Sequence, residues 1–163
     1  MLNALNILML EIYFILGLLS FAGIILGLIL GMIAPEELKP GAPWFIKLKN
    51  TIFILLILIL LYYNIYNLII IPLIIFLILY WYRGTLGEES YMLEYSMMGS
   101  LFGMGYYTPA IPEIIGLIFI YKITSGSLLI YKNNNFNFLI KSICLRLIFY
   151  ILGLLLPLMF ANV

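Results

Sequence analysis

The stretch LNILMLEIYFILGLLSFAGIILGLILGMI, residues 5–33, carries a single charged side chain, Glu11. A helix that crosses a membrane needs about 17–25 predominantly apolar residues, so this stretch predicts a transmembrane helix. The apolar part of a cleaved secretion signal has only about 7–15 residues and follows a basic segment. No basic residue precedes this stretch. We therefore expect a transmembrane helix that is retained rather than cleaved.

The rest of the chain has the same apolar character. Of its 163 residues, 66% are hydrophobic and 9% are charged, and its mean hydropathy is +1.20. Soluble domains carry about 25% charged residues, so this composition indicates that membrane lipids surround most of the protein. Backbone groups in lipid must be satisfied within helices or closed barrels, and the long apolar runs favour helices. We predict one all-α domain over residues 1–163, a polytopic transmembrane helix bundle.

Six apolar segments define the predicted helices, at about residues 5–33, 46–63, 67–82, 91–107, 110–126 and 138–160. The apolar run over 51–82 is too long for one crossing, and the cluster YYNIYN at 62–67 divides it into a hairpin. Both arms of this hairpin are apolar on all sides. That pattern is typical of helices that face lipid, so we expect the hairpin at the edge of the bundle.

The basic residues support this six-helix topology. They collect in or beside three of the connecting segments: Lys39, Lys47, Lys49, Arg83, Lys122, Lys132 and Lys141. Lys and Arg gather in cytoplasmic loops, so we predict that loops 34–50, 83–90 and 127–137 are cytoplasmic and that both termini lie outside. Arg146, inside the last predicted helix, is the exception.

Missing residue types exclude several chemistries. The chain has no His and no Asp, which removes the His–Glu zinc-peptidase motif, the Ser–His dyad and paired aspartates. It has no Gly-rich phosphate loop, and its one cysteine, Cys144, lies in an apolar run and is expected to be a buried structural thiol. The net charge of +1 argues against a nucleic-acid partner. We expect no enzymatic activity, no cofactor and no metal.

Glycines repeat at every fourth position on two predicted helices. Gly23, Gly27 and Gly31 do so on the first, and Gly99 and Gly103 do so on the fourth. This spacing lets helix backbones approach closely in lipid. We predict tight packing between helices of the same chain at these residues, and a face for a second copy of the chain is the alternative.

Three glutamates fall inside or at the edge of predicted helices, Glu11, Glu94 and Glu113, and Arg146 is the matching cation. A charge in a membrane span costs about 2.5–3.5 kcal/mol on insertion scales, so it usually has a partner or a role. The topology places Glu94 and Arg146 near the cytoplasmic side, and we predict that they form an ion pair. Glu11 and Glu113 are expected toward the outer side.

The segment TPAIPE, residues 108–113, contains two prolines that interrupt a helix. Because proline lacks the N–H that a helix interior needs, Pro109 and Pro112 predict a break followed by the first turn of the fifth helix. Glu113 then lies near the positive end of that helix and is expected to face protein. The alternative is a re-entrant break that lines a polar cavity, with Glu113 as its functional carboxylate.

The longer stretch TPAIPEIIG, residues 108–116, resembles a signature of the stage II sporulation protein M-like membrane proteins of bacteria and archaea. That signature reads Pro-His-Gly-Ile-x-Glu and leads into a helix of small residues. Ile111 and Glu113 match it, and Thr108, Pro109 and Ala110 stand at its Pro, His and Gly positions. Pro109 in place of the histidine is a departure from the family.

The likeness extends over most of the chain, in KNTIFILLILIL at 49–60, PLIIFLILYWYRGTLG at 72–87 and LGLLLPLMFANV at 152–163. These segments resemble the family's second, third and final helices. The resemblance implies a multi-pass protein of a prokaryotic plasma membrane without known catalysis. In the name-giving branch, such a protein acts as a membrane scaffold for machinery that remodels the cell envelope.

Three functions stay open from the sequence. The missing catalytic residue types, the short loops and the resemblance favour a non-enzymatic scaffold or interaction subunit of a cell-envelope assembly. Its partners would be other membrane proteins or a second copy of the chain. A transport or channel component is the first alternative, with Glu11 and Glu113 lining a polar path. A lipid-modifying membrane enzyme that uses a glutamate as base is the other.

Overall fold

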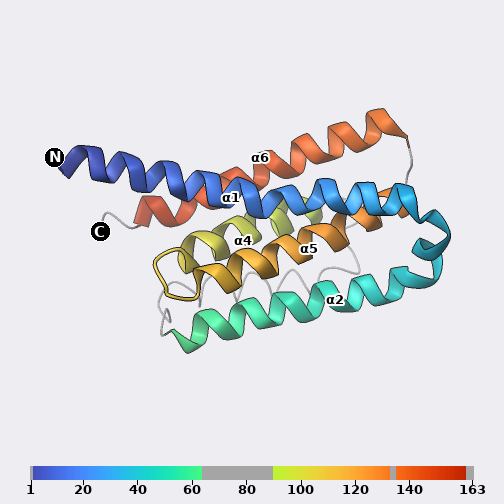
Figure 1. Cartoon of the computed structure of the whole chain (residues 1–163), viewed down its shortest axis with the longest axis horizontal. Helices are drawn as coiled ribbons and strands as arrows, with labels where there is room; N and C mark the ends of the chain where they lie inside the picture. Colours follow the sequence, from blue (N-terminus) through green and yellow to red (C-terminus); the bar gives the residue numbers. More distant parts are fainter. Residues whose placement is uncertain (1, 64–89, 133–134, 161–163) are drawn as a thin grey trace.

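The computed structural model describes residues 2–63, 90–132 and 135–160, and all of its regular elements there are helices (Figure 1). In chain order they are α1 (Leu2–Ile33), α2 (Pro35–Tyr62), α4 (Ser90–Gly105), α5 (Ile111–Lys132) and α6 (Phe136–Phe160). The all-α class is therefore confirmed. The predicted helix at 67–82 and residues 83–89 of the predicted loop lie outside the described residues, so a count of six helices stays a prediction.

Four of the described helices are long and apolar enough to cross a membrane, in Leu8–Ile33, Pro35–Tyr62, Ile111–Lys132 and Phe136–Leu158. The fifth, α4, has 16 residues and is shorter than a typical span. The helices lie side by side, and α1 begins at the end of the bundle where α6 finishes (Figure 1). Exposed Leu and Ile side chains cover the outside, for example on α1 and α6. These lengths and this apolar exterior are those of a membrane protein.

Glycines bring α1 and α5 into backbone contact. A Cβ atom added at Gly23 would collide with the carbonyl of Phe119, and one added at Gly27 would collide with the carbonyl of Ile123. The approach is reciprocal, because a Cβ at Gly126 would collide with the carbonyl of Ile24. One turn farther along α1, a Cβ on Gly31 would lie 3.2 Å from the Cβ of Ile130. The predicted glycine face of the first helix therefore packs within the chain, against α5.

A second glycine contact joins α4 to α6. A Cβ at Gly99 would collide with the carbonyl of Tyr150, and one at Gly153 would collide with the carbonyl of Ser96. Gly103 lies farther along α4, where a Cβ would come within 2.6 Å of the Pro157 ring. Both predicted glycine repeats are thus used between helices of one chain, as small residues are in membrane bundles.

The second helix begins eleven residues earlier than expected. The sequence predicts a loop over 34–50 because it is rich in Pro, Gly and charge, yet α2 starts at Pro35. Proline is well suited to the first helical position, where its missing N–H has no partner to lose. The carboxylates of Glu36 and Glu37 lie in the first turn, where the positive end of the helix dipole stabilises negative charge. Pro40 and Pro43 lie within the helix, and its first turns bend around the end of the bundle (Figure 1).

The fifth helix also runs beyond its predicted end, to Lys132 rather than residue 126. Small residues in this part of α5 are contact residues. Gly126 lies against the α1 backbone, and Ser127 Oγ donates a 3.0 Å hydrogen bond to the carbonyl of Gly27. As a consequence, Lys122 lies in the middle of a helix rather than beside a cytoplasmic loop.

Tyrosine hydroxyls form buried hydrogen bonds between α1 and α6. Tyr13 donates a 2.6 Å hydrogen bond to the carbonyl of Leu154, and Ser20 and Tyr150 share a 2.6 Å hydrogen bond between their hydroxyls. These bonds satisfy polar groups that would otherwise be costly in an apolar interior. Cys144, in contrast, is exposed on α6, so the prediction of a buried thiol is wrong. An apolar sequence context in a membrane helix does not distinguish the lipid face from the core.

Candidate functional site

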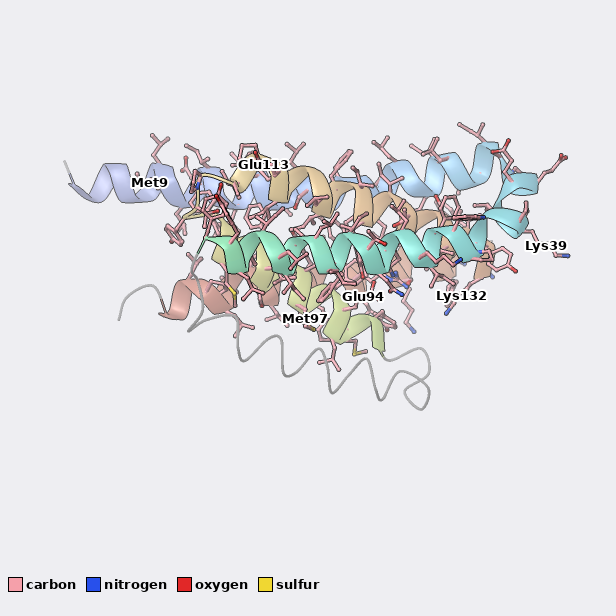
Figure 2. All side chains as sticks on the ribbon, turned by 90° about the horizontal axis from the view of Figure 1, so that it is seen from below. Met9, Lys39, Glu94, Met97, Glu113 and Lys132 are labelled. Atoms are coloured by element: carbon pink, nitrogen blue, oxygen red, sulfur yellow. The ribbon has the colours of Figure 1, made fainter. Side chains whose placement is uncertain are left out.

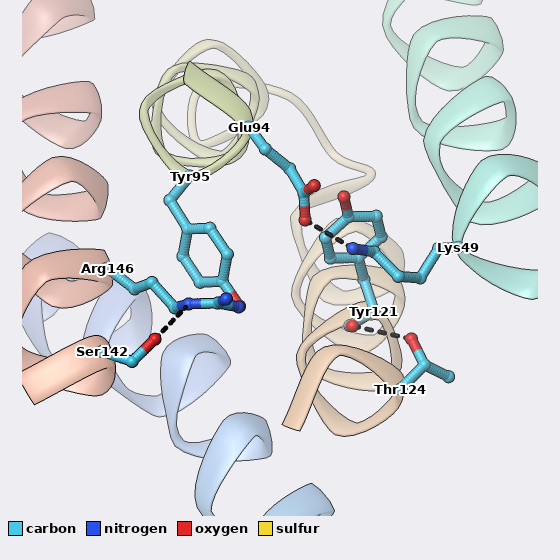
Figure 3. Close-up of polar contacts among 7 residues, drawn as sticks. All are labelled: Lys49, Glu94, Tyr95, Tyr121, Thr124, Ser142 and Arg146. Carbon is cyan, nitrogen blue, oxygen red and sulfur yellow. Dashed lines mark hydrogen bonds and ion pairs between the residues drawn. The ribbon is translucent and has the colours of Figure 1, made fainter. Parts of the chain in front are cut away.

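An ion pair joins α2 to α4 inside the bundle. Lys49 Nζ lies 2.6 Å from Glu94 Oε1, and the two side chains are only 10% and 21% exposed (Figure 3). Lys49 occupies the buried stripe of α2, three and four residues before Ile52 and Phe53, which aims its side chain inward. Its ammonium also lies 4.9 Å from the centre of the Tyr121 ring on α5. The pair therefore connects three helices.

A second cation, Lys122, is fully enclosed by aromatic rings. Its side chain is 0% exposed, and its Nζ lies 3.3 Å from the Tyr95 ring centre, 4.7 Å from that of Tyr150 and 5.5 Å from that of Phe21. Ring faces attract ammonium groups at these distances. Among the described residues, however, Nζ has no hydrogen-bond acceptor. An ammonium without acceptors in an apolar interior is costly, so Lys122 is an unusual feature of this fold.

Arg146 reaches the same tyrosine from α6. Its Nη1 donates a 3.2 Å hydrogen bond to the Tyr95 hydroxyl, and its Nε donates one of the same length to Ser142 Oγ. The guanidinium carbon lies 5.1 Å from the ring centres of both Tyr91 and Tyr95. The hydrogen-bond partners of Arg146 within the described residues are neutral.

The predicted pair of Glu94 with Arg146 is therefore wrong. Both residues lie at the same level of the bundle, as the topology requires, but Glu94 turns to Lys49 while Tyr95 stands beside Arg146 (Figure 3). Adjacent residues on a helix point about 100° apart. Because of this angle, Glu94 faces α2 and α5 while Tyr95 faces α6. The prediction failed because Lys49 was assigned to a loop.

We call Lys49, Glu94, Tyr95, Tyr121, Lys122 and Arg146 the tyrosine–cation cluster. It contains three cations and one carboxylate, contributed by α2, α4, α5 and α6. Figure 2 places Glu94 between the two ends of the bundle, with Lys39 and Lys132 at one end and Met9 and Glu113 toward the other. The sequence did not single out Lys49 or Lys122. The available signal was their spacing from apolar residues on the buried faces of α2 and α5.

The proline break has the predicted backbone but a different side-chain arrangement. Helix α4 ends at Gly105 and α5 begins at Ile111. Pro109 therefore lies between the two helices and Pro112 in the first turn of α5, and no single helix contains both prolines. Glu113 lies in the first turn of α5, as predicted. Its side chain is exposed, so the expectation that it faces protein is wrong. Glu11 is likewise exposed on α1.

Tyrosines rather than Glu113 attach the break to the bundle. Tyr106 donates a 3.2 Å hydrogen bond to the carbonyl of Met9, and its ring packs edge-on against Tyr13 with 4.9 Å between ring centres. Within the segment, Thr108 Oγ1 donates a 2.7 Å hydrogen bond to the carbonyl of Gly105. These contacts satisfy the end of α4. The carboxylate of Glu113 takes no part in these contacts and is exposed on the surface of the bundle.

Residues that could hold a metal are not grouped in the part of the chain that the structure describes: no three of Cys, Asp and Glu come together there. Comparison of the chain with protein-family models, with curated proteins and with solved structures finds no match. The tyrosine–cation cluster, with its fully buried lysine, is therefore the candidate site that the geometry itself supplies.

Proposed function

We propose that the chain is a non-enzymatic, multi-pass protein of a prokaryotic plasma membrane that serves as a scaffold or interaction subunit of a cell-envelope assembly. The likeness of TPAIPEIIG at 108–116 to stage II sporulation protein M-like proteins supports this role. We further propose membership of that family, with other membrane proteins as the partners and a second copy of the chain as one possible partner.

One structural observation carries the proposal. The first turns of α2 form an exposed surface at one end of the bundle, with charges of both signs and a large aromatic ring. Glu36, Glu37 and Lys39 are exposed there, Trp44 is 71% exposed, and Lys47 Nζ lies 5.0 Å from the centre of the Trp44 ring. Lys39 points away from the bundle (Figure 2). A large exposed aromatic side chain with a polar rim around it suits contact with a partner protein.

Several polar groups within the described helices serve the fold. Tyr13 and Ser127 donate to backbone carbonyls of neighbouring helices, and Glu94 pairs with Lys49. A nucleophile needs a base within hydrogen-bond reach, and these groups are engaged otherwise. A transport path lined by Glu11 and Glu113 draws no support from their positions, because both side chains are exposed.

Site-specific photocrosslinking tests the proposal. A photoreactive phenylalanine derivative is placed at Trp44 in the α2 surface and, as a matched control, at Leu58, which is 53% exposed on the apolar part of the same helix. In native membranes, we expect a discrete protein adduct from position 44 and only lipid adducts from position 58. If position 44 also gives lipid adducts alone, the α2 surface does not bind a protein and the proposal fails.

A further inference from the structure

We propose that the tyrosine–cation cluster is a binding site for a phosphate-bearing anion, held by Lys122 and Arg146. This inference goes beyond the scaffold role and does not depend on it. Lys122 Nζ is fully enclosed and lacks a hydrogen-bond acceptor among the described residues. Nearly all buried polar groups in proteins have hydrogen-bond partners, so unused ammonium donors point to a missing acceptor.

The charge of the cluster indicates the sign of that acceptor. Lys49 and Glu94 neutralise each other at 2.6 Å, which leaves Lys122 and Arg146 as two further cations at the same level of the bundle. Both lie close to Tyr95, with Lys122 Nζ at 3.3 Å and Arg146 Cζ at 5.1 Å from its ring centre. Two cations near one ring repel each other strongly where water is scarce. An anion between them would convert that repulsion into attraction.

The two cations have the chemistry of a phosphate site. A guanidinium offers a planar fork of donors that matches phosphate oxygens, and an ammonium adds a compact point charge. The Tyr95 hydroxyl lies 3.2 Å from Arg146 Nη1 and adds a hydroxyl next to the guanidinium. Phe21 and Tyr150 present their rings to Lys122, and Tyr91 presents its ring to Arg146. A carboxylate ligand could also bind, but the fork and point charge together suit a tetrahedral oxyanion best.

Arg146 gives the direction of approach. It is half-buried, as is Tyr91 beneath it, whereas Lys122 is enclosed. Its hydrogen bonds go to the neutral hydroxyls of Ser142 and Tyr95, and these are weaker than bonds between a guanidinium and an anion. Arg146 can therefore exchange them for an anion and deliver it toward Lys122. The surface between α4 and α6 is the expected entrance.

Two sources supply this chemistry, a free phosphate ion and the headgroup of an anionic lipid. The test uses the full chain in nanodiscs of phosphatidylcholine. In one arm, inorganic phosphate is added, with chloride at equal ionic strength as the reference. In the other, phosphatidic acid replaces a tenth of the phosphatidylcholine. Thermal unfolding and native mass spectrometry report binding in both arms.

The variants separate a built site from general attraction to basic residues. Lys122→Met keeps the length of the side chain and removes its charge and donors. Arg146→Gln removes the guanidinium and keeps a polar group, and it serves as the second variant if Lys122→Met fails to fold. Lys132→Met, at an exposed cation outside the α2 surface, is the matched control.

We expect one of the two probes to bind the parent and Lys132→Met with affinities within twofold, and Lys122→Met and Arg146→Gln at least tenfold more weakly. A response to inorganic phosphate identifies a free anion as the ligand, and a response to phosphatidic acid alone identifies a lipid headgroup. Equal binding by the parent and Lys122→Met would show that Lys122 does not hold the anion, and no response to either probe would show that the cluster binds none; either result would overturn the proposal.

Discussion

Lys49 Nζ lies 2.6 Å from Glu94 Oε1, and this contact links α2 to α4 within the apolar bundle (Figure 3). The two helices otherwise pack mainly against α5 and α6, respectively. The ion pair thus fixes the position of α2 relative to α4 at the level of the tyrosine–cation cluster. Glu94 also brings a negative charge close to Lys122, which has no hydrogen-bonded acceptor of its own among the described residues.

The pair predicts non-additive mutations. Lys49→Leu or Glu94→Leu alone leaves one charge buried without its partner, which costs about 3–5 kcal/mol in a fully buried pair and less here, since Glu94 is 21% exposed. The double replacement leaves neither charge and should lose less stability than the two single changes combined. Unfolding of the three variants in detergent measures this cycle. Additive losses would show that the two side chains act independently.

The glycine contacts predict a sharp difference between two alanine substitutions. A Cβ at Gly27 would collide with the Ile123 carbonyl, whereas a Cβ at Gly116 on α5 meets nothing within 4 Å. Gly27→Ala should therefore cost about 1–3 kcal/mol through overpacking. Gly116→Ala should raise stability by up to about 1 kcal/mol, because alanine is the better helix former. Melting temperatures of the purified variants check this. Equal melting temperatures would mean that α1 and α5 do not approach closely at Gly27.

Lys122→Met is expected to keep or raise the stability of the protein, unlike the substitutions at the ion pair and at Gly27. In the absence of added anions, the substitution removes an ammonium that is 0% exposed and has no hydrogen-bond acceptor in the described part of the chain. Replacing buried charge by an apolar side chain of similar volume is often neutral or stabilising by about 1–4 kcal/mol. We expect the variant to melt at or above the temperature of the parent in phosphate-free buffer. A clear loss of stability would indicate that Lys122 has an acceptor in the folded protein.

The backbone architecture was largely predictable from local sequence. The glycine spacing at Gly23, Gly27 and Gly31 located the tight face of α1, because only a missing Cβ allows such an approach. Pro109 and Pro112 located the break, because two missing N–H groups cannot be accommodated in one regular helix. The start of α2 was missed, since Pro35 is compatible with both a loop and a first helical turn.

The candidate site was harder to predict because it depends on which face of its helix each residue occupies, and not only on the residue type. Lys49 was counted with the predicted loop 34–50 and Lys122 beside the predicted loop 127–137, since Lys residues usually collect in cytoplasmic loops. Their burial follows from helix phase: Lys49 shares the buried stripe of α2 with Ile52 and Leu56, and Lys122 follows Ile118 by four residues on α5. Which carboxylate pairs with which cation then depends on helix positions that a single sequence does not specify.

Two substitutions at Glu113 distinguish an exposed carboxylate from one that holds the fold together. The carboxylate is exposed in the first turn of α5, where its attraction to the positive end of the helix contributes about 0.3–1 kcal/mol. We therefore expect small losses of stability for both Glu113→Gln and Glu113→Leu, close to each other in size. Denaturant unfolding in detergent compares them. A large loss for leucine with none for glutamine would instead show that Glu113 hydrogen-bonds to protein.

The distribution of exposed charge predicts the orientation in the membrane. Lys39 and Lys132 lie at one end of the bundle (Figure 2), and Lys141 is exposed near the start of α6 at that end. In the described residues, the opposite end carries the exposed Glu11 and Glu113 and no Lys or Arg. Because basic residues stay on the cytoplasmic side, the end with Lys39 should face the cytoplasm and Tyr107, 64% exposed at the proline break, should face outward.

Cysteine labelling tests this orientation directly. The exposed Cys144 is first replaced by serine, and single cysteines are introduced at Lys39, Lys132 and Tyr107. A maleimide that cannot cross the membrane should label position 107 in intact cells, and positions 39 and 132 only after permeabilisation. Cysteine in place of these exposed residues leaves the packing unchanged, so altered labelling reports sidedness rather than misfolding. Labelling of position 39 in intact cells, with position 107 protected, would reverse the orientation and with it the assignment of the α2 surface to the cytoplasm.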